Sequence, residues 1–222
     1  MAASENDILR RCPLFKGMTD EEIAAALRFY RAARRRYQKG DALIRIGDSV
    51  SRFALVLSGT VQIMSDDLDG HHMIMATVTP GQTFAESMCY QRTAESQVYA
   101  VCVEAGETYW MSTEGLLKSG DGECLEHADR FLRMLTLKTL SMNDRIQILS
   151  KPTIRQKLMT LFSQYAAREG HMFNLPFDRS DMAVYLGVNR SALSRELSLM
   201  KKEGLIDFYK NSFSLPQGKK LP

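Results

Sequence analysis

Between residues 37 and 111, apolar residues occur in short runs that glycines separate. Gly59, Gly70 and Gly81 lie 11 residues apart, a spacing typical of an antiparallel β-sandwich or barrel. The predicted strands are rich in β-branched, aromatic and other apolar residues, and they cover 42–46, 53–57, 61–64, 73–78, 97–103 and 108–111. Asp69-Gly70 is a strong signal for a hairpin turn. This part of the chain is therefore predicted to be an all-β domain.

A different spacing, of three and four residues alternately, begins at residue 125. The positions on this seam are Leu125, Ala128, Leu132, Leu135, Thr139, Met142 and Ile146, and Leu149 continues the pattern. A seam sustained over more than three heptads predicts a long helix that pairs with a second copy, so these residues form the predicted dimer interface. Phe131, Met134 and Leu137 fall outside the seam, which leaves open a helix that packs only within its own chain.

Two shorter helical patterns meet at Gly187. The first has an inner stripe of Met182, Ala183 and Leu186, and Gly187 suits a turn conformation that side chains resist. Asn189 is placed to cap the second helix. This arrangement of helix, glycine turn and helix is the arrangement of a helix-turn-helix.

The second of these helices carries two arginines on its outward side. Arg190, Ser191, Ser194 and Arg195 project from its amino-terminal turns, which in a helix-turn-helix enter the major groove. A guanidinium donates two parallel hydrogen bonds to O6 and N7 of guanine. Arg190 and Arg195 are thus predicted to read bases, with Ser191 and Ser194 as secondary contacts. The alternative is an ordinary helical hairpin with solvated arginines.

The chain after this helix predicts a β-hairpin wing. Gly204 ends the helix, and the short apolar runs 205–209 and 212–215 are separated by Lys210-Asn211. Lys201 and Lys202 are predicted to lie near phosphates. Residues 151–222 carry 12 Lys and Arg against 6 Asp and Glu, whereas residues 1–150 carry 17 against 20. The basic charge therefore accompanies the motif, as expected of a domain that binds double-stranded DNA.

Composition excludes several other classes of protein. No apolar run among the 222 residues approaches 18, so no membrane span is predicted. The polar residues 1–11 do not resemble a secretory signal, and the protein is expected in the cytoplasm. Cys12, Cys89, Cys102 and Cys124 lie too far apart in sequence for the usual metal or redox pairs, so neither metal nor cofactor is predicted.

These patterns predict three parts: a β-domain over residues 1–120, a long helix over 121–149 and a DNA-binding domain over 150–222. Ser150-Lys151-Pro152 interrupts the helical pattern and is predicted to be a hinge, with Ser150 as the cap of the next helix. Near the amino terminus, Thr19 and Glu22 have the spacing of a capping box. The run 34–36, all arginine, follows that helix and is interpreted as a solvated edge; nucleic-acid contact is the alternative.

Over nearly all of its length, the chain resembles the Crp/Fnr superfamily of bacterial transcription factors. The likeness is carried by Leu57-Ser58-Gly59-Thr60-Val61, by the segment from Gly81 to Glu86-Ser87, and above all by Tyr185-Leu186-Gly187-Val188-Asn189-Arg190 with Leu193-Ser194-Arg195-Glu196-Leu197. The resemblance implies an α+β fold with an amino-terminal double-stranded β-helix (jelly-roll) sensor, a long dimerisation helix and a carboxy-terminal winged helix. It also implies a homodimer that binds an operator, without enzyme activity, under the control of an effector.

The effector site departs from the family pattern. In cyclic-nucleotide-binding relatives a glutamate holds the ribose, and ten residues later an arginine and a serine or threonine clamp the phosphate. Glu86 fits the first role, but the clamp position holds Ser96-Gln97. The candidates for the effector pocket are Glu86, Ser87, Arg92, Ser96 and Gln97. Because the clamp arginine is missing, cyclic AMP is not the expected ligand, and the effector stays an unknown small molecule.

Other ligands and functions have weaker signals. His71-His72 is a weak haem candidate, because adjacent strand residues face opposite sides of a sheet. Oxygen-sensing relatives carry clustered cysteines near the amino terminus, where this chain has only Cys12. A metal-dependent, cupin-like enzyme would need histidines two residues apart, and an architectural DNA binder would need no sensor domain. RNA polymerase is a candidate partner, but no motif for it is recognisable, so activation and repression are both open.

Overall fold

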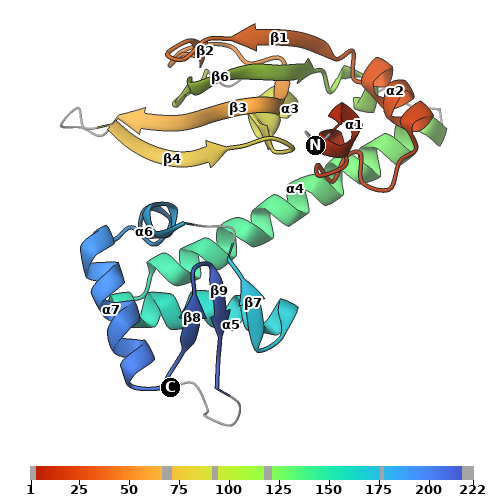
Figure 1. The fold of residues 1–222 in the computed structure, drawn as a ribbon. Helices are drawn as coiled ribbons and strands as arrows, with labels where there is room; N and C mark the ends of the chain where they lie inside the picture. Colours follow the sequence, from red (N-terminus) through yellow and green to blue (C-terminus); the bar gives the residue numbers. More distant parts are fainter. Residues whose placement is uncertain (1–3, 67–71, 92–94, 118–121, 176–177, 217–222) are drawn as a thin grey trace. The chain divides into compact units, whose positions relative to one another are not determined.

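The computed structural model describes residues 4–66, 72–91, 95–117, 122–175 and 178–216 (Figure 1). Contacts within the chain define two compact units, Met1–Thr136 and Leu137–Pro222, here called the roll unit and the winged unit. Within the described ranges, no helix is both long and apolar enough to cross a membrane. The fold is α+β, as predicted.

The roll unit contains one antiparallel sheet of six strands. These are β1 (Ala33–Tyr37), β2 (Ala42–Ile44), β3 (Phe53–Asp66), β4 (His72–Val78), β5 (Thr83–Phe84) and β6 (Tyr99–Met111). The strand order is β1-β6-β3-β4, with β2 paired to β6 and β5 paired to β3. Its inner face holds a core of aliphatic side chains together with Phe84 and Trp110. The prediction of a β-roll is therefore confirmed.

Two predicted pairs of strands are each one continuous strand. β3 covers both 53–57 and 61–64, and β6, which begins at Tyr99, includes most of 97–103 and all of 108–111. Their pairing shifts register on either side of Gly59, which has a φ of +75°. A Cβ on Gly59 would lie 2.5 Å from the carbonyl oxygen of Glu104, and one on Gly106 would lie 2.0 Å from that of Ser58. These glycines therefore permit a bulge and a close backbone approach and do not end a strand.

The arginine run is a strand that the apolar pattern did not reveal. In β1, Ala33 pairs with Trp110 and Tyr37 pairs with Gly106. The three arginines between them are exposed, so no alternation of apolar and polar residues marks the strand. The predicted Asp69-Gly70 turn lies outside the described residues.

Short helices cover one end of the roll. They are α1 (Glu5–Leu9), α2 (Asp20–Phe29), α3 (Glu86–Gln91) and the 3₁₀ turn η1 (Glu114–Leu117). Thr19 and Glu22 form the predicted capping box at the start of α2. A second core, which includes Phe15, Tyr30 and Phe53, joins these helices to the roll.

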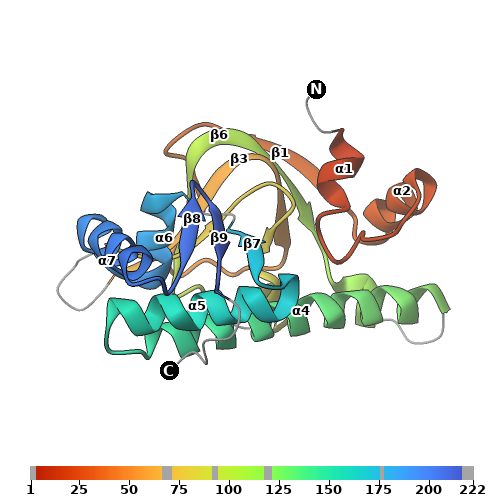
Figure 2. The same ribbon diagram turned by 60° about the horizontal axis from the view of Figure 1, so that its bottom comes forward.

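The long helix α4 (Gly122–Leu149) is continuous, as predicted, and its residues belong to both units (Figures 1 and 2). Near its start, Phe131 and Met134 are buried in the core of the roll unit. Near its end, Ile148 is buried in the core of the winged unit. The helix thus contributes to two separate hydrophobic cores.

The winged unit continues with α5 (Ile154–Glu169), β7 (Met172–Asn174), α6 (Arg179–Leu186), α7 (Arg190–Lys202), β8 (Asp207–Tyr209) and β9 (Ser212–Ser214). Its three strands form a sheet in the order β7-β9-β8. One prediction was wrong here: the cap of α5 is Thr153, which accepts a hydrogen bond from Gln156 N, and not Ser150. The hydroxyl of Ser150 instead donates to the carbonyl oxygen of Gln147. The α4 helix therefore ends at Leu149, and the new helix begins three residues later than a Ser150 cap would give.

Candidate nucleic-acid interface and its supporting elements

The turn between α6 and α7 has the predicted helix-turn-helix geometry. Asp178 caps α6, and the backbone amides of Ser180 and Asp181 that bind its carboxylate keep the pKa of Asp178 below its ordinary value. Gly187 adopts the left-handed conformation, with φ 60° and ψ 47°. The amide of Val188 then donates to the carbonyl of Ala183 at 3.0 Å. A left-handed glycine at this position lets the chain leave one helix and begin the next within three residues.

The start of α7 is fixed by its predicted cap. Asn189 Oδ1 accepts from Ser191 N at 2.9 Å and from Ser191 Oγ at 2.6 Å. On the inner face of α7, Leu193, Leu197 and Met200 are buried in the core. The cap and this apolar stripe determine which side of the helix faces outward.

The four predicted DNA-reading residues lie on the outward side. Arg190, Ser191, Ser194 and Arg195 are all exposed, and within the described part of the chain no ion pair involves either arginine. Glu196, the acid that follows Arg195, is neutralised by an arginine of α5. Arg155 donates to Glu196 at 2.6 Å and to Glu203 at 2.8 Å. These bonds raise the pKa of Arg155. Sequence reasoning did not identify Arg155, because its partners lie on another helix, more than 40 residues away.

The structure separates the two lysines that were predicted to lie near phosphates. Lys201 forms an ion pair with Asp207 at 2.6 Å and donates to the carbonyl oxygen of Phe208 at 3.1 Å. Lys202 is exposed, and no described residue forms an ion pair with it. Only Lys202 thus keeps a fully solvated charge.

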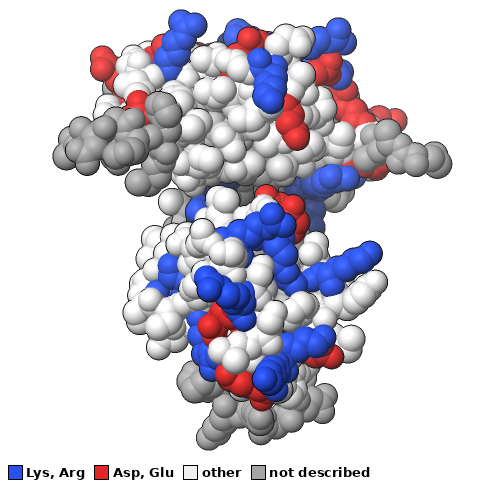
Figure 3. Space-filling view, turned by 60° about the vertical axis from the view of Figure 1, so that its left-hand side comes forward, with Lys and Arg blue, Asp and Glu red and all other residues white. Residues whose placement is uncertain are grey.

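Basic side chains gather on this side of the winged unit. Figure 3 brings the side of α7 forward, and lysine and arginine side chains lie across the winged unit with fewer acidic ones between them. This distribution matches the excess of 12 basic over 6 acidic residues in 151–222. Such a field attracts a phosphate backbone.

The predicted seam of α4 presents a row of exposed apolar side chains. The exposed fractions are 73% for Leu125, 63% for Leu132, 64% for Met142 and 60% for Ile146. Thr139 is also exposed, whereas Ala128 and Leu135 are half-buried, and Leu135 packs against the roll core. Large apolar side chains left exposed in a row are typical of an interface.

The predicted effector residues do not all face one site. Glu86 is buried at the start of α3, whereas Ser87 and Gln97 are exposed. Ser96 is fully buried, and its hydroxyl donates to the carbonyl oxygen of Val98 at 2.6 Å. Arg92 and, of the haem candidates, His71 and the side chain of His72 lie outside what the structure describes. Ser96 therefore forms part of a local turn, with its hydroxyl bonded within its own segment.

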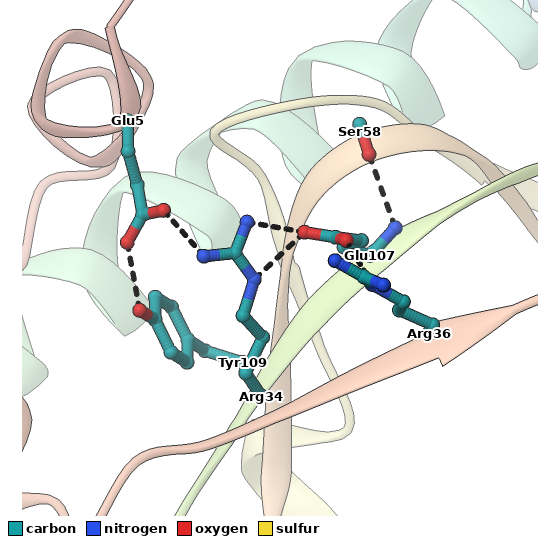
Figure 4. A network of polar contacts seen from close by, with 6 residues as sticks. All are labelled: Glu5, Arg34, Arg36, Ser58, Glu107 and Tyr109. Carbon is teal, nitrogen blue, oxygen red and sulfur yellow. Dashed lines mark hydrogen bonds and ion pairs between the residues drawn. The ribbon is translucent and has the colours of Figure 1, made fainter.

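Two of the three arginines of β1, Arg34 and Arg36, form ion pairs with acids, as Figure 4 shows. Arg34 donates to Glu5 at 2.8 Å and also pairs with Glu107, while Arg36 donates to Glu107 at 2.6 Å. These two guanidinium groups keep the pKa of Glu107 below its ordinary value. Partial burial, and a hydrogen bond to Glu5, raise the pKa of Tyr109 to about 12. The interpretation as a solvated edge is therefore correct in one respect, the exposure of the arginines. It missed the ion pairs that Arg34 and Arg36 form within the chain.

Two family models match the chain, one within each unit. Residues 34–118 match the cyclic nucleotide-binding domain, and residues 156–221 match the Crp-like helix-turn-helix domain. Among curated proteins, the chain is 25% identical over 203 residues to the transcriptional activator protein FnrL of Cereibacter sphaeroides, covering 84% of this chain and 76% of the relative. It is 23% identical to electron transport regulator A of Shewanella oneidensis, covering 77% and 69%.

Solved structures show the same fold. CprK complexed with OCPA aligns with a TM-score of 0.61 at 17% identity, covering 86% of this chain and 88% of that one. FixK2 from Bradyrhizobium japonicum aligns with a TM-score of 0.55 at 21% identity, covering 83% and 92%. The curated relatives are transcription regulators, which rules out the cupin-like enzyme. The chain belongs to the Crp/Fnr superfamily, and it is a DNA-binding transcription regulator with an effector-type β-roll domain.

Proposed function

We propose that the protein acts in the cytoplasm as a homodimer that binds an inverted-repeat operator. The observation that carries this proposal is the outward side of α7, where Arg190 and Arg195 are exposed and Glu196 is neutralised by Arg155. In the major groove, a base edge would thus meet two guanidinium groups that form no ion pair with any described residue.

Each DNA-facing residue has a role that follows from its contacts. Arg190 and Arg195 read guanines through bidentate hydrogen bonds. Ser194 is a secondary contact, and Ser191 retains acceptor capacity although its hydroxyl donates to Asn189. Asn189 acts as the helix cap, and Lys202 binds a phosphate.

The dimer forms through the seam of α4. Pairing two copies would bury Leu125, Leu132, Met142 and Ile146, which are all more than half exposed in one chain. A two-fold dimer places the same surface of each copy against the other. Its two recognition helices would then enter successive major grooves, about 34 Å apart.

The roll domain supplies control. Its match to the cyclic nucleotide-binding domain supports a small-molecule effector in this unit, and the missing clamp arginine supports a ligand other than cyclic AMP. RNA polymerase is the further partner that this role would require if the protein activates transcription.

Selection of DNA from a randomised duplex pool tests the proposal. The wild-type protein should enrich an inverted repeat whose half-site centres are about 10–10.5 base pairs, or a multiple of that, apart. Guanines should occur in each half-site. Retention of DNA without enrichment of any sequence would contradict the proposal and favour the architectural alternative.

A further inference from the structure

The wing is a small hairpin whose position depends on its neighbours. β8 and β9 have three residues each, and β8 is at the edge of the sheet. Along β8 only Phe208 is partly buried, whereas Asp207 and Tyr209 are exposed. A hairpin of this size has little stability of its own. The contacts that hold β8 therefore determine where the wing lies.

Lys201, in the last turn of α7, makes three contacts with β8. Its Nζ lies 2.6 Å from Asp207 Oδ1, 3.1 Å from the carbonyl oxygen of Phe208 and 5.0 Å from the centroid of the Phe208 ring. The ion pair keeps the pKa of Asp207 below its ordinary value. One side chain thus joins the recognition helix to the wing.

Arg179, the first residue of α6, holds the same hairpin from another helix. Its guanidinium lies 4.8 Å from the centroid of the Phe208 ring and 5.1 Å from that of Phe213. Its Nη2 donates to the carbonyl oxygen of Lys210, in the wing turn, at 3.1 Å. Partial burial lowers the pKa of Arg179. Both helices of the helix-turn-helix therefore place a cation against the wing.

We propose that Lys201 and Arg179 are wing-positioning residues, which fix the wing relative to α7 and α6 so that both meet DNA together. This inference rests on the proposed function. Lys201 acts on DNA through Asp207 and Phe208 and does not bind a phosphate. The side chains of Lys201 and Asp207 are 49% and 71% exposed, and an ion pair this exposed adds little to stability. Its effect is therefore on the place of the wing and not on folding.

The substitution Asp207→Asn separates this role from a phosphate contact. If Lys201 bound a phosphate, removal of the competing carboxylate would release the ammonium and remove a negative charge near DNA, so affinity would rise. If Lys201 positions the wing, the same change breaks the contact, so affinity falls. The two roles thus predict opposite signs for one conservative, exposed substitution.

The experiment titrates each variant with the inverted-repeat duplex selected by the wild-type protein, and with a random duplex of equal length, over a range of salt concentrations. Asp207→Asn and Lys201→Ala should each weaken operator binding by roughly three- to tenfold and leave the salt slope unchanged. The double variant should be no weaker than either single variant, because both changes remove one shared contact. The matched control is Lys202→Ala, which should weaken binding to both duplexes and reduce the salt slope by about one unit.

Thermal unfolding of each variant shows whether the fold is retained. Wild-type affinity for Asp207→Asn, or a higher one, together with a reduced salt slope for Lys201→Ala, would overturn the inference and make Lys201 a phosphate contact. In that case the wild type and Lys202→Ala would still behave as expected, and the proposed function would stand. If the wild-type protein did not distinguish the two duplexes, the proposed function itself would fail.

Discussion

Two arginines of β1, Arg34 and Arg36, and the two arginines of α7 are all exposed, but their surroundings are opposite. Arg34 and Arg36 share Glu107, and Arg34 also binds Glu5. Arg190 and Arg195 have no such acid within the described ranges, and Glu196, which follows Arg195, is bound by Arg155. Arg34 and Arg36 thus link parts of the roll unit, whereas the arginines of α7 remain available to another molecule.

This difference shows that exposure and positive charge alone do not make an arginine available to a nucleic acid. A guanidinium that already donates to one or two carboxylates has fewer donors left for a base or a phosphate. The same rule separates Lys201, which pairs with Asp207, from its neighbour Lys202. A basic surface is therefore available for binding where its cations have no carboxylate partner within the chain.

The largest effect is expected from the seam of α4, because the proposed inverted-repeat operator is bound by two copies of α7 together. Leu132→Asp combined with Met142→Asp places like charges at exposed seam positions and should release monomers. Operator affinity should then fall by about 10²- to 10⁴-fold as avidity is lost. Sedimentation velocity and operator titration measure both effects.

Leu137→Asp is the matched control for the seam. Leu137 is a leucine of the same helix, 54% exposed, but it lies outside the seam, so this variant should remain a dimer. A dimer that persists in the double seam variant would show that the seam is not the interface.

A smaller effect is expected when one reading arginine is removed. Arg195→Ala should weaken binding to the selected operator by about 1–3 kcal/mol, or roughly 5- to 150-fold, and have much less effect on a random duplex. Arg36→Ala, which removes a guanidinium that Glu107 already binds, should change neither affinity. Side-by-side titrations measure these differences. Equal losses for Arg195→Ala on both duplexes would mean that this residue binds a phosphate.

The sequence predicted the helix-turn-helix well because its determinants are local. The end of α6 is determined by Gly187, and the start of α7 by its cap Asn189. The buried stripe of α7 lies on the same short helix as the residues whose direction it determines. The long helix was equally predictable, since its apolar spacing extends over its whole length. Most of the predicted strands were found, but β1 was missed because its three exposed arginines hide any alternation. The continuity of β3 through Gly59 was missed as well, because a bulge and a turn have the same local signal.

The ion pairs that determine which arginines remain available could not be predicted, because they join segments that are distant in the sequence. Arg155 reaches Glu196 and Glu203 across 41 and 48 positions, and Arg34 reaches Glu107 across 73. A single sequence gives no signal for such pairs. The sequence therefore located the helix-turn-helix and left open which of its cations are already paired.

A small pH effect is expected from the β1 network. Because Arg34 and Arg36 hold the pKa of Glu107 below its ordinary value, the folded protein binds this proton less tightly than the unfolded chain. The carboxylate therefore stabilises the fold above its unfolded pKa, and this contribution is lost as the pH falls through the lower folded pKa. Glu107→Gln should lower the free energy of unfolding slightly near neutral pH and leave it unchanged in strong acid.

Arg34→Gln serves as the partner variant, since it removes the guanidinium and should show the same reduced pH dependence. Chemical denaturation at several pH values gives the comparison. An identical pH dependence in the wild type and Glu107→Gln would mean that the network does not contribute to stability.

The smallest expected effect, which is none at all, concerns cyclic AMP. In the family's cassette a cation faces the cyclic phosphate, but the clamp position of this chain holds Ser96, whose hydroxyl donates to the carbonyl oxygen of Val98. Burying a phosphate without a cation or several convergent donors is unfavourable by several kcal/mol. Glu86, buried at the start of α3, adds a carboxylate that in the family lies near the same ligand.

Isothermal titration of cyclic AMP into the apo-protein should therefore give no binding heat at micromolar concentrations. The midpoint temperature of thermal unfolding should also be the same with and without cyclic AMP. The variant Arg92→Ala makes a positive result interpretable, because Arg92 is the only arginine between Glu86 and Ser96. Micromolar binding that is lost in Arg92→Ala would contradict the prediction and show that this arginine replaces the missing clamp. Micromolar binding that survives the change would contradict it differently, since backbone donors at the start of α3 would then suffice to hold a phosphate. Either result would show that the roll unit has an anion-binding site, and that this site does not depend on Arg34 and Arg36, which are already paired with acids.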